Sequence, residues 1–319
     1  MHEFDIIKKY FLKLSLNNKS ALRLNDDVFF DKSKKLVVTV DTYEKGVHFI
    51  NFKKPELVIK KILRSSLSDI ICKGVKPKYY FISASGNNIS FSNTNLLKIS
   101  KSLREEQKKY DIYLCGGDTT RSKKLSFTII CIGFANKIIL RNNTKLNDDI
   151  YVTGNLGDSF IGLEILKNRI KLNNRLKKYF EKKYFLPDLH INLIKKLSKI
   201  ANSSIDLSDG LIADLEKLIN KQNFSYKIYL DKIPVSKNLK KLIIKKRLKK
   251  LSCISNGDDY QILFTASRSK SRIVRQISKS LGIRISKIGK ICKSSLKPQI
   301  IDEKGAKINL KSKGYYHKF

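Results

Sequence analysis

The sequence predicts an α/β (α+β) protein made of two consecutive α/β halves. Three observations lead to this prediction. Strand-like and helix-like segments alternate along the chain, the alternation restarts after a polar stretch at 142–149, and 319 residues suffice for two ordinary domains. We therefore expect one domain at residues 1–141 and a second at residues 142–319.

The first half is expected to contain four strands and two helices. Strands are predicted at 35–41, 78–85, 112–115 and 125–135, and helices at 55–73 and 93–110. The first strand is rich in β-branched residues, and Pro55 and Gly74 stand where a helix begins and ends. The segment 125–135 is almost uniformly apolar, so we expect it at the centre of a sheet or at an interface.

The second half repeats the alternation with different lengths. Strands are predicted at 150–153, 204–206, 226–230, 260–266, 284–292 and 299–302, and helices at 158–167, 209–221, 269–281 and twice within 171–200. The densest basic cluster, at 240–250, carries apolar residues at helical spacing. We interpret this cluster as the solvated face of a helix.

The charge of the chain is the feature that most invites a functional interpretation. With 66 basic and 28 acidic residues, the formal net charge is +38, which is typical of nucleic-acid-binding proteins. However, the lysines are spread over the whole chain, and no nucleic-acid-binding motif accompanies them. We attribute the charge to overall composition and expect no nucleic-acid partner. Nucleic-acid binding stays open as an alternative that rests on charge alone.

Several classes of protein are disfavoured by what the sequence lacks. No apolar run approaches the ~18–20 residues of a membrane span, and the N-terminal residues do not read as a signal peptide. The five cysteines are odd in number and form no CxxC pair, so we expect reduced thiols and a cytoplasmic location. Because apolar runs are short, we expect no membrane partner. The Walker, protein-kinase, GxSxG and HExxH motifs are absent from the sequence.

The scarce acidic residues gather beside glycine, serine and threonine. The groups are Asp26-Asp27, Asp41, Asp69, Asp118, Asp206 with Asp209, and Asp258-Asp259. Asp41 is expected at the end of a strand, and Asp69 in the middle of a helix, where aspartate is unfavourable. Carboxylates that converge would repel one another unless a divalent cation neutralises them, and Mg²⁺ prefers such oxygen ligands. The alternative is that each aspartate is a helix cap or turn residue.

Two glycine-containing segments are candidate phosphate sites. The run GGDTTR at 116–121 is expected as a loop after a strand, where glycines let backbone N–H groups approach an anion. Threonine hydroxyls and an arginine suit phosphate oxygens. The segment 151–159 runs from a strand through glycines into a helix, which also suits an anion. A tight turn and an ordinary N-cap at Asp158-Ser159 are the respective alternatives.

Taken in order, these motifs resemble those of the thiamine-monophosphate kinases, a family within the aminoimidazole ribonucleotide synthetase superfamily. The resemblance runs nearly end to end, and its most specific runs are GGDTTR at 116–121 and IDLSDGL at 205–211. It implies transfer of a phosphoryl group from ATP to thiamine monophosphate with several Mg²⁺ ions. It also implies a homodimer whose N-terminal domains form a shared, barrel-like β-structure.

The resemblance also implies roles for individual residues by matched position. The implied metal ligands are Asp27, Thr39, Asp41, Asp69, Asp118, Asp206 and Asp209, with Asp41, Asp69 and Asp118 as the catalytic aspartates. The implied ATP contacts are Gly117, Asp118, Arg141 and Ser208. His48 and Asp258 are the implied contacts to thiamine monophosphate.

The chain departs from the family pattern at four single positions and in the segment 186–190, where an Arg-Pro-x-Pro-Arg pattern is reduced to LPDLH. Asn25 replaces a glycine, Val40 a small hydroxyl residue, Asp258 a glutamate, and Ser312 an aromatic residue expected to stack on the thiamine ring. Tyr315 or Tyr316 would be the substitute for that aromatic residue. These departures leave two alternatives open: another ATP-dependent activity of the superfamily (amide or selenide activation), and a degraded relative that binds nucleotide without transferring phosphate. The lack of a cysteine near the N-terminus disfavours the former.

Overall fold

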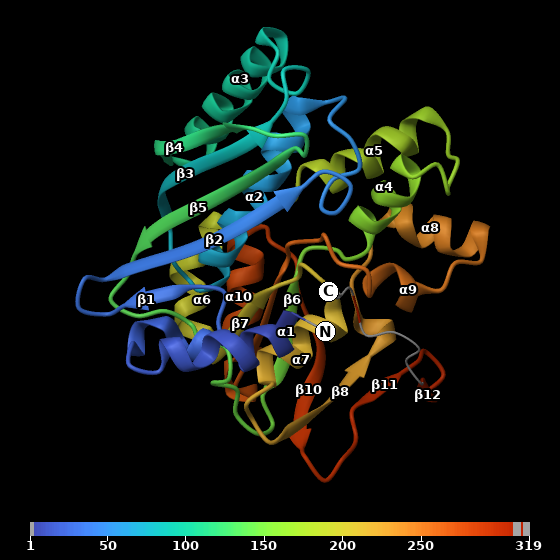
Figure 1. The fold of residues 1–319 in the computed structure, drawn as a ribbon. Helices are drawn as coiled ribbons and strands as arrows, with labels where there is room; N and C mark the ends of the chain where they lie inside the picture. The colour runs from blue at the N-terminus through green and yellow to red at the C-terminus, as the bar shows by residue number, and fades with distance from the viewer. Residues whose placement is uncertain (1–2, 309–313, 315–319) are drawn as a thin grey trace.

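The computed structural model describes residues 3–308 and 314, and its core is formed by two separate β-sheets (Figure 1). Strands up to residue 134 form the first sheet, and strands from residue 149 onward form the second. The predicted domain boundary at 141–142 therefore falls in the segment that connects the two sheets. The α/β (α+β) fold class is confirmed.

The first sheet has five strands in the order β1-β2-β5-β3-β4. Its elements are β1 (Phe29–Asp31), β2 (Leu36–Glu44), α2 (Pro55–Cys72), β3 (Pro77–Gly86), α3 (Asn93–Tyr110), β4 (Tyr113–Arg121) and β5 (Ser126–Phe134). They are preceded by α1 (Glu3–Ile6), η1 (Ile7–Phe11), η2 (Leu12–Ser15) and η3 (Lys19–Leu24), which the sequence did not predict. The apolar strand β5 lies at the centre, as predicted.

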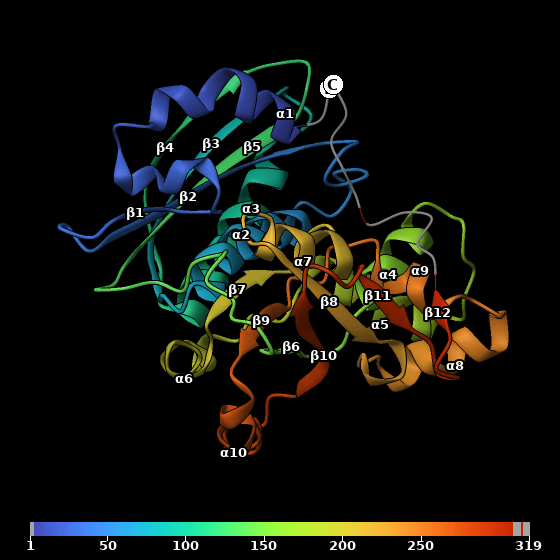
Figure 2. The same cartoon turned by 90° about the horizontal axis from the view of Figure 1, so that it is seen from below.

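The two long helices of the first half cover one face of this first sheet. Figure 2 shows α2 and α3 on the same side of the strands. Alternate residues of β2 and β5 are buried beneath them, because successive side chains of a strand point to opposite faces. On the other face, Val40 and Phe134 are more than half exposed, at 59% and 51%. Exposed apolar residues on the open face of a sheet are typical of an interaction surface.

The second sheet has seven strands in the order β12-β11-β8-β10-β6-β9-β7. Its strands are β6 (Asp149–Thr153), β7 (Ser203–Asp206), β8 (Phe224–Tyr229), β9 (Ile262–Ala266), β10 (Ile285–Lys293), β11 (Gln299–Ile301) and β12 (Lys307–Ile308). Its α-helices are α4 (Asp158–Leu166), α5 (Asn174–Phe185), α6 (Ile194–Ile200), α7 (Leu211–Ile219), α8 (Lys237–Lys246), α9 (Lys250–Ile254) and α10 (Ser271–Leu281). Short 3₁₀ turns are η4 (Ile191–Leu193), η5 (Leu230–Lys232) and η6 (Arg268–Lys270). In α8, Leu239 and Leu242 are buried while the lysines face outward, which confirms the predicted solvated helix for that part of 240–250.

Helix α2 joins the two halves. Its side chains belong to the same hydrophobic cluster as Tyr184 of α5 and Phe264 of β9. Polar contacts run across the same boundary, because Ser204 Oγ on β7 donates a hydrogen bond to the carbonyl of Cys72. Residues on α2 are therefore fixed relative to both sheets.

Two expectations about local structure are wrong. The run 116–121 continues strand β4 instead of forming a loop, and Asp41 lies inside β2 instead of at its end.

Among the described strands, most pairs are antiparallel, and β3–β4 and β8–β11 are parallel. The described helices include none that is long and apolar enough to cross a membrane.

Candidate active site

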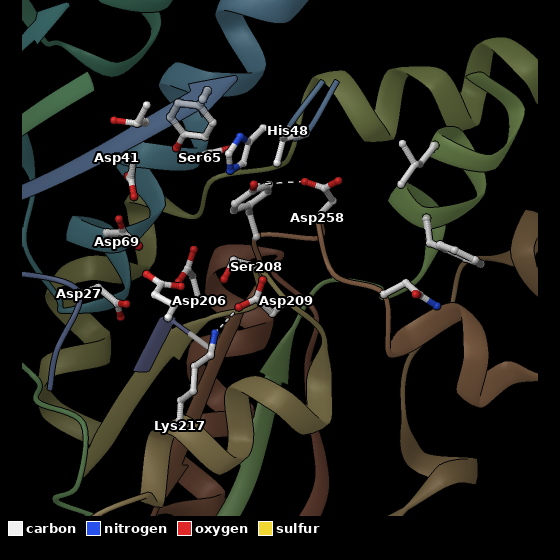
Figure 3. Close-up of a pocket in the computed structure, with 18 of the residues that line it drawn as sticks. Asp27, Asp41, His48, Ser65, Asp69, Asp206, Ser208, Asp209, Lys217 and Asp258 are labelled. Atoms are coloured by element: carbon white, nitrogen blue, oxygen red, sulfur yellow. Dashed lines mark hydrogen bonds and ion pairs between the residues drawn. The ribbon is translucent and has the colours of Figure 1, made fainter. Parts of the chain in front are cut away.

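A pocket of about 660 Å³ lies between the two halves of the chain (Figure 3). Its walls come from the loop before β1, from β2 and α2, and from the loops that follow β7 and precede β9. These segments are far apart in sequence and meet because α2 packs on both sheets. The pocket contains most of the residues that the sequence singled out.

Three buried or half-buried carboxylates converge on one side of the pocket. Asp27, Asp69 and Asp206 each offer an oxygen that lies within 4.8 Å of the others. They come from the loop before β1, from the last turn of α2 and from the last residue of β7. Of the aspartates expected to converge, Asp27 and Asp69 therefore meet within a single chain, together with Asp206, which the family resemblance implied as a metal ligand.

Hydroxyl groups hold this acidic cluster in place. Thr39 Oγ1 on β2 donates to Asp69 Oδ2 at 2.9 Å and lies 3.0 Å from the Asp27 carbonyl oxygen. Ser68 Oγ donates to Asp206 Oδ2. Figure 3 shows Asp41 on the same side of the pocket as Asp27 and Asp69. Asp41 shares the face of β2 that carries buried Thr39, whereas exposed Val40 points the other way.

Burial and mutual repulsion set the protonation of these groups. Burial, followed by the charges of Asp41 and Asp206, raises the pKa of Asp69 well above its ordinary value. Burial and the charge of Asp27 raise the pKa of Asp206 to about 7. Burial also raises the pKa of Asp41. The cluster therefore lacks enough positive charge to keep all its carboxylates ionised.

Asp27 is the exception in this cluster. Burial acts to raise its pKa, but the positive charges of Arg141, Lys73 and Lys217 outweigh burial and hold the pKa below its ordinary value. The guanidinium of Arg141 pairs directly with Asp27, and Lys73 Nζ lies 3.5 Å from Asp27 Oδ2. The acidic cluster thus has an ionised end and an end that takes up protons.

The donor set fits a hard divalent cation. Asp41 Oδ2 is buried and has no hydrogen-bond partner among the described residues, and Asp27 Oδ2, likewise without a hydrogen bond there, faces the Lys73 ammonium at 3.5 Å. Every candidate ligand in the cluster is an oxygen, the donor type that Mg²⁺ prefers. A buried carboxylate oxygen without a partner is unfavourable, so this is where a cation would bind.

One implied ATP contact of the second half, Ser208, and one implied metal ligand, Asp209, lie in the same pocket. Ser208 and Asp209 both line it, and the Asp209 carboxylate pairs with Lys217 of α7. Lys217 also lies 2.9 Å from Asp214, whose carboxylate accepts hydrogen bonds from the backbone N–H groups of Asp209 and Gly210. These contacts fix the loop 207–210 at the start of α7.

The two predicted substrate residues occupy the other side of the pocket (Figure 3). His48 Nδ1 accepts a hydrogen bond from the Glu44 backbone at 3.0 Å. Asp258 Oδ1 accepts from Lys61 Nζ at 2.6 Å and from the Tyr260 hydroxyl at 3.2 Å. The acidic cluster and the substrate residues therefore face one cavity from opposite sides.

Gly117 and Asp118 do not line the pocket of their own chain. The strand register pairs Asp41 with Ile129, Ile129 with Ile82, and Ile82 with Gly117. Three strand spacings, about 14 Å in total, thus separate Asp41 from Gly117. The expectation that Asp118 joins the other carboxylates is not met within one chain. Its carboxylate instead accepts from the Thr119 N–H at 2.8 Å.

The glycine at 117 has a structural explanation of its own. Its φ is +157°, and a Cβ atom there would lie 1.7 Å from the carbonyl oxygen of Ile82. The close approach of β3 therefore requires a glycine, independently of any phosphate.

Of the remaining departures from the family pattern, the structure describes Asn25 but not Ser312. Asn25 forms a side-chain hydrogen bond with Asn220 at 3.2 Å, which ties the loop before β1 to the end of α7. Ser312, Tyr315 and Tyr316 lie outside the described residues.

Sequence reasoning missed three lysines of the site: Lys61, Lys73 and Lys217. Each is buried or nearly so, and each pairs with an aspartate of the pocket. Among 66 basic residues no sequence signal distinguishes them, because the tertiary fold alone decides which lysines are buried.

Known proteins match this chain in sequence and in fold. Residues 21–135 match the family model "AIR synthase related protein, N-terminal domain". The chain is 34% identical to a thiamine-monophosphate kinase of Buchnera aphidicola subsp. Acyrthosiphon pisum, covering 99% of this chain and 98% of the relative. It is 32% identical to that of Haemophilus influenzae, covering 91% and 89%. Among solved structures, "AaThiL complexed with AMPPCP and TMP" superposes with a TM-score of 0.85 at 26% identity, covering 99% of this chain and 97% of that one.

The two sheets and the carboxylate-lined pocket between them thus define an enzyme with an AIR synthase related N-terminal domain. The 34% identity to a thiamine-monophosphate kinase over nearly the whole chain assigns the enzyme to one particular family. The chain belongs to the thiamine-monophosphate kinase family, and the resemblance inferred from GGDTTR and IDLSDGL is confirmed.

Proposed function

We propose that this protein transfers the terminal phosphoryl group of ATP to thiamine monophosphate, which gives ADP and thiamine diphosphate. The observation that carries the proposal is the convergence of Asp27, Asp69 and Asp206 within 4.8 Å in a pocket whose other side presents His48 and Asp258. The similar structure AaThiL holds AMPPCP, an analogue of ATP, together with TMP. A pocket of about 660 Å³ is within the size range of small-molecule sites.

We propose Mg²⁺ as the metal, held by Asp27, Asp69 and Asp206 with Asp41 and Thr39 beside them. When bound, it would neutralise phosphate oxygens and align the two substrates, which is the main requirement of phosphoryl transfer. Ser208, Arg141 and Asp209 would lie on the nucleotide side. In the transfer itself, the bond from the γ-phosphorus to the bridging oxygen breaks as a phosphate oxygen of thiamine monophosphate attacks. No protein nucleophile is required.

We further propose that the enzyme is a homodimer formed through its first sheet. Every residue of edge strand β4 is exposed, including Tyr113 and Leu114, and the open face adds Val40 and Phe134. Edge strands of this kind pair with another chain unless they are protected. In such a dimer, Gly117 and Asp118 of one subunit would complete the pocket of the other, in the roles that the family resemblance implies. We propose that the reaction takes place in the cytoplasm, because its co-substrate ATP is available there.

Product analysis tests this proposal. The protein is incubated with ATP, Mg²⁺ and thiamine monophosphate, with free thiamine as the control acceptor. We expect equal amounts of ADP and thiamine diphosphate, no product from free thiamine, and complete inhibition by EDTA. Binding of ATP without formation of thiamine diphosphate would contradict the substrate assignment and favour an alternative activity of the superfamily.

A further inference from the structure

Lys61 of α2 is a buried cation at the substrate side of the pocket. Only 1% of the residue is exposed, although lysine is almost never fully buried without a partner. Its Nζ lies 2.6 Å from Asp258 Oδ1 and 4.0 Å from the centre of the Tyr184 ring. Lys61 does not itself line the pocket, whereas Asp258 and Tyr184 do.

Lys61 contacts one of the two carboxylate oxygens of Asp258. Both Lys61 Nζ and the Tyr260 hydroxyl bond to Oδ1, which leaves Oδ2 available to a ligand. Asp258 has a positive φ of 62°, and its backbone N–H donates to the carbonyl of Ser208 at 2.9 Å. Its main chain is therefore fixed, and the Lys61 ammonium sets the direction of its side chain.

Lys61 also reaches the second substrate residue through Tyr184. The ammonium packs on the ring of Tyr184, and the hydroxyl of Tyr184 donates to the carbonyl oxygen of His48 at 3.2 Å. Cation–π packing and a charge-assisted hydrogen bond are both strengthened when water is excluded. One buried cation thus connects Asp258, from the second half, with His48, from the first.

We propose that Lys61 is a positioning residue for thiamine monophosphate: it orients the Asp258 carboxylate toward the cationic substrate and fixes Tyr184 and His48 opposite it. The inference rests on the proposed function. It assigns Lys61 an effect on the thiamine phosphate side of the pocket and none on the nucleotide side.

The chain offers a matched control in the neighbouring residue. Lys60 lies on the same helix and pairs with Glu105, whose side chain is 49% exposed. K60M and K61M therefore remove the same charge from adjacent positions, one in a partly exposed pair with α3 and one beside the pocket. Methionine preserves the length of the lysine stem and packs well against aromatic rings, so K61M retains contact with Tyr184.

The test measures binding and kinetics for both substrates. Binding of thiamine monophosphate is followed by calorimetry, and KM is measured for each substrate with the other saturating. For K61M we expect Kd and KM for thiamine monophosphate to rise at least about 10-fold, as for loss of a charged hydrogen bond. We expect KM for ATP to stay within about twofold, and K60M to change neither constant. Equal effects on both substrates, or wild-type constants for thiamine monophosphate, would overturn the inference.

A double variant tests whether Lys61 acts through Asp258. Because methionine keeps the contact with Tyr184, the lost charge should act through Asp258, and K61M/D258N should bind thiamine monophosphate no more weakly than D258N alone. Multiplied losses would overturn the inference. If K61M does not fold, Y184F takes its place, because it removes only the hydroxyl bond to His48; we expect weaker binding of thiamine monophosphate and unchanged binding of ATP. Wild-type protein that binds thiamine monophosphate but forms no product contradicts the proposed function alone, and the binding constants still decide on Lys61. Failure to bind it at all overturns both.

Discussion

The ammonium nitrogen of Lys73 lies 2.7 Å from Oδ1 of Asp26, and both side chains are buried. Lys73 directly follows α2, and its Nζ also donates to the carbonyl of Ser204 on β7 at 3.1 Å. It therefore joins the three segments that supply Asp69, Asp206 and Asp27. The positive charge at this point balances part of the acidic cluster before any metal is bound.

Replacing Lys73 by methionine should lower the free energy of unfolding by about 3–5 kcal/mol, because Asp26 would remain buried without its partner. Urea denaturation of the metal-free protein measures the change. Lys76→Met is the control, since its pair with Asp111 is about half exposed and should contribute less than about 1 kcal/mol. Equal losses for the two variants would contradict the role given to Lys73.

Asp69→Asn should reduce turnover by on the order of 100-fold or more, because a ligand of the proposed Mg²⁺ is lost at the site of charge development. It should also abolish the rise in melting temperature that Mg²⁺ gives the wild type. Scanning calorimetry with and without Mg²⁺ measures that rise. Asp31→Asn, on half-buried strand β1 and away from the pocket, is the control and should retain both properties. Persistent stabilisation by Mg²⁺ in the Asp69 variant would place the metal elsewhere.

The metal-free protein should become more stable as the pH is lowered from about 8 to about 6. Burial and Asp27 raise the pKa of Asp206 to about 7, so the folded state binds a proton that the unfolded chain, with its ordinary lower pKa, does not. The bound proton therefore stabilises the folded state below about pH 7, and this stabilisation is lost as the pH rises through about 7. Denaturation across this range measures the slope. Asp206→Asn should flatten it; an unchanged slope in that variant would assign the effect to other groups.

Gly117→Ala should destabilise the protein by roughly 3–5 kcal/mol, the range for severe backbone conflicts. The added Cβ would lie 1.7 Å from the Ile82 carbonyl oxygen and would force β4 away from β3. Thermal unfolding measures the effect. Gly282→Ala, where φ is also positive but nothing lies within 4 Å of the added atom, serves as the comparison. A similar small loss at both positions would mean that β3 and β4 tolerate the separation.

Subunit mixing tests whether Asp118 acts across the proposed dimer. Asp118→Asn and Asp69→Asn homodimers should each be nearly inactive. After they are unfolded and refolded together, half of the dimers are mixed, and each mixed dimer has one complete site. Activity should therefore return to about a quarter of wild type. No recovery would show that Asp118 acts in its own chain or has no catalytic role. Leu114→Glu should in addition yield monomers in analytical ultracentrifugation.

The sequence by itself determined the family, the order of the elements and the identity of the main acidic residues. Helix 93–110 was predicted with its observed bounds, and the segment of β5 was predicted at the centre of a sheet or at an interface, because periodicity and apolar runs are local signals. Convergence was expected of Asp27, Asp41, Asp69 and Asp118, and the family resemblance added Asp206; the structure brings Asp27, Asp69 and Asp206 together. The start of the chain at 3–24 gave no such periodic signal.

Only the tertiary structure decided which residues meet. The motif at 116–121 suggests a phosphate loop, yet the pairing of β4 with β3 extends it into an exposed strand three strands away from Asp41. Likewise, Lys61 and Lys73 look like any other lysine of a very basic chain. They become distinct because α2 packs against both sheets and excludes water from them, and burial of a charge depends on the whole fold.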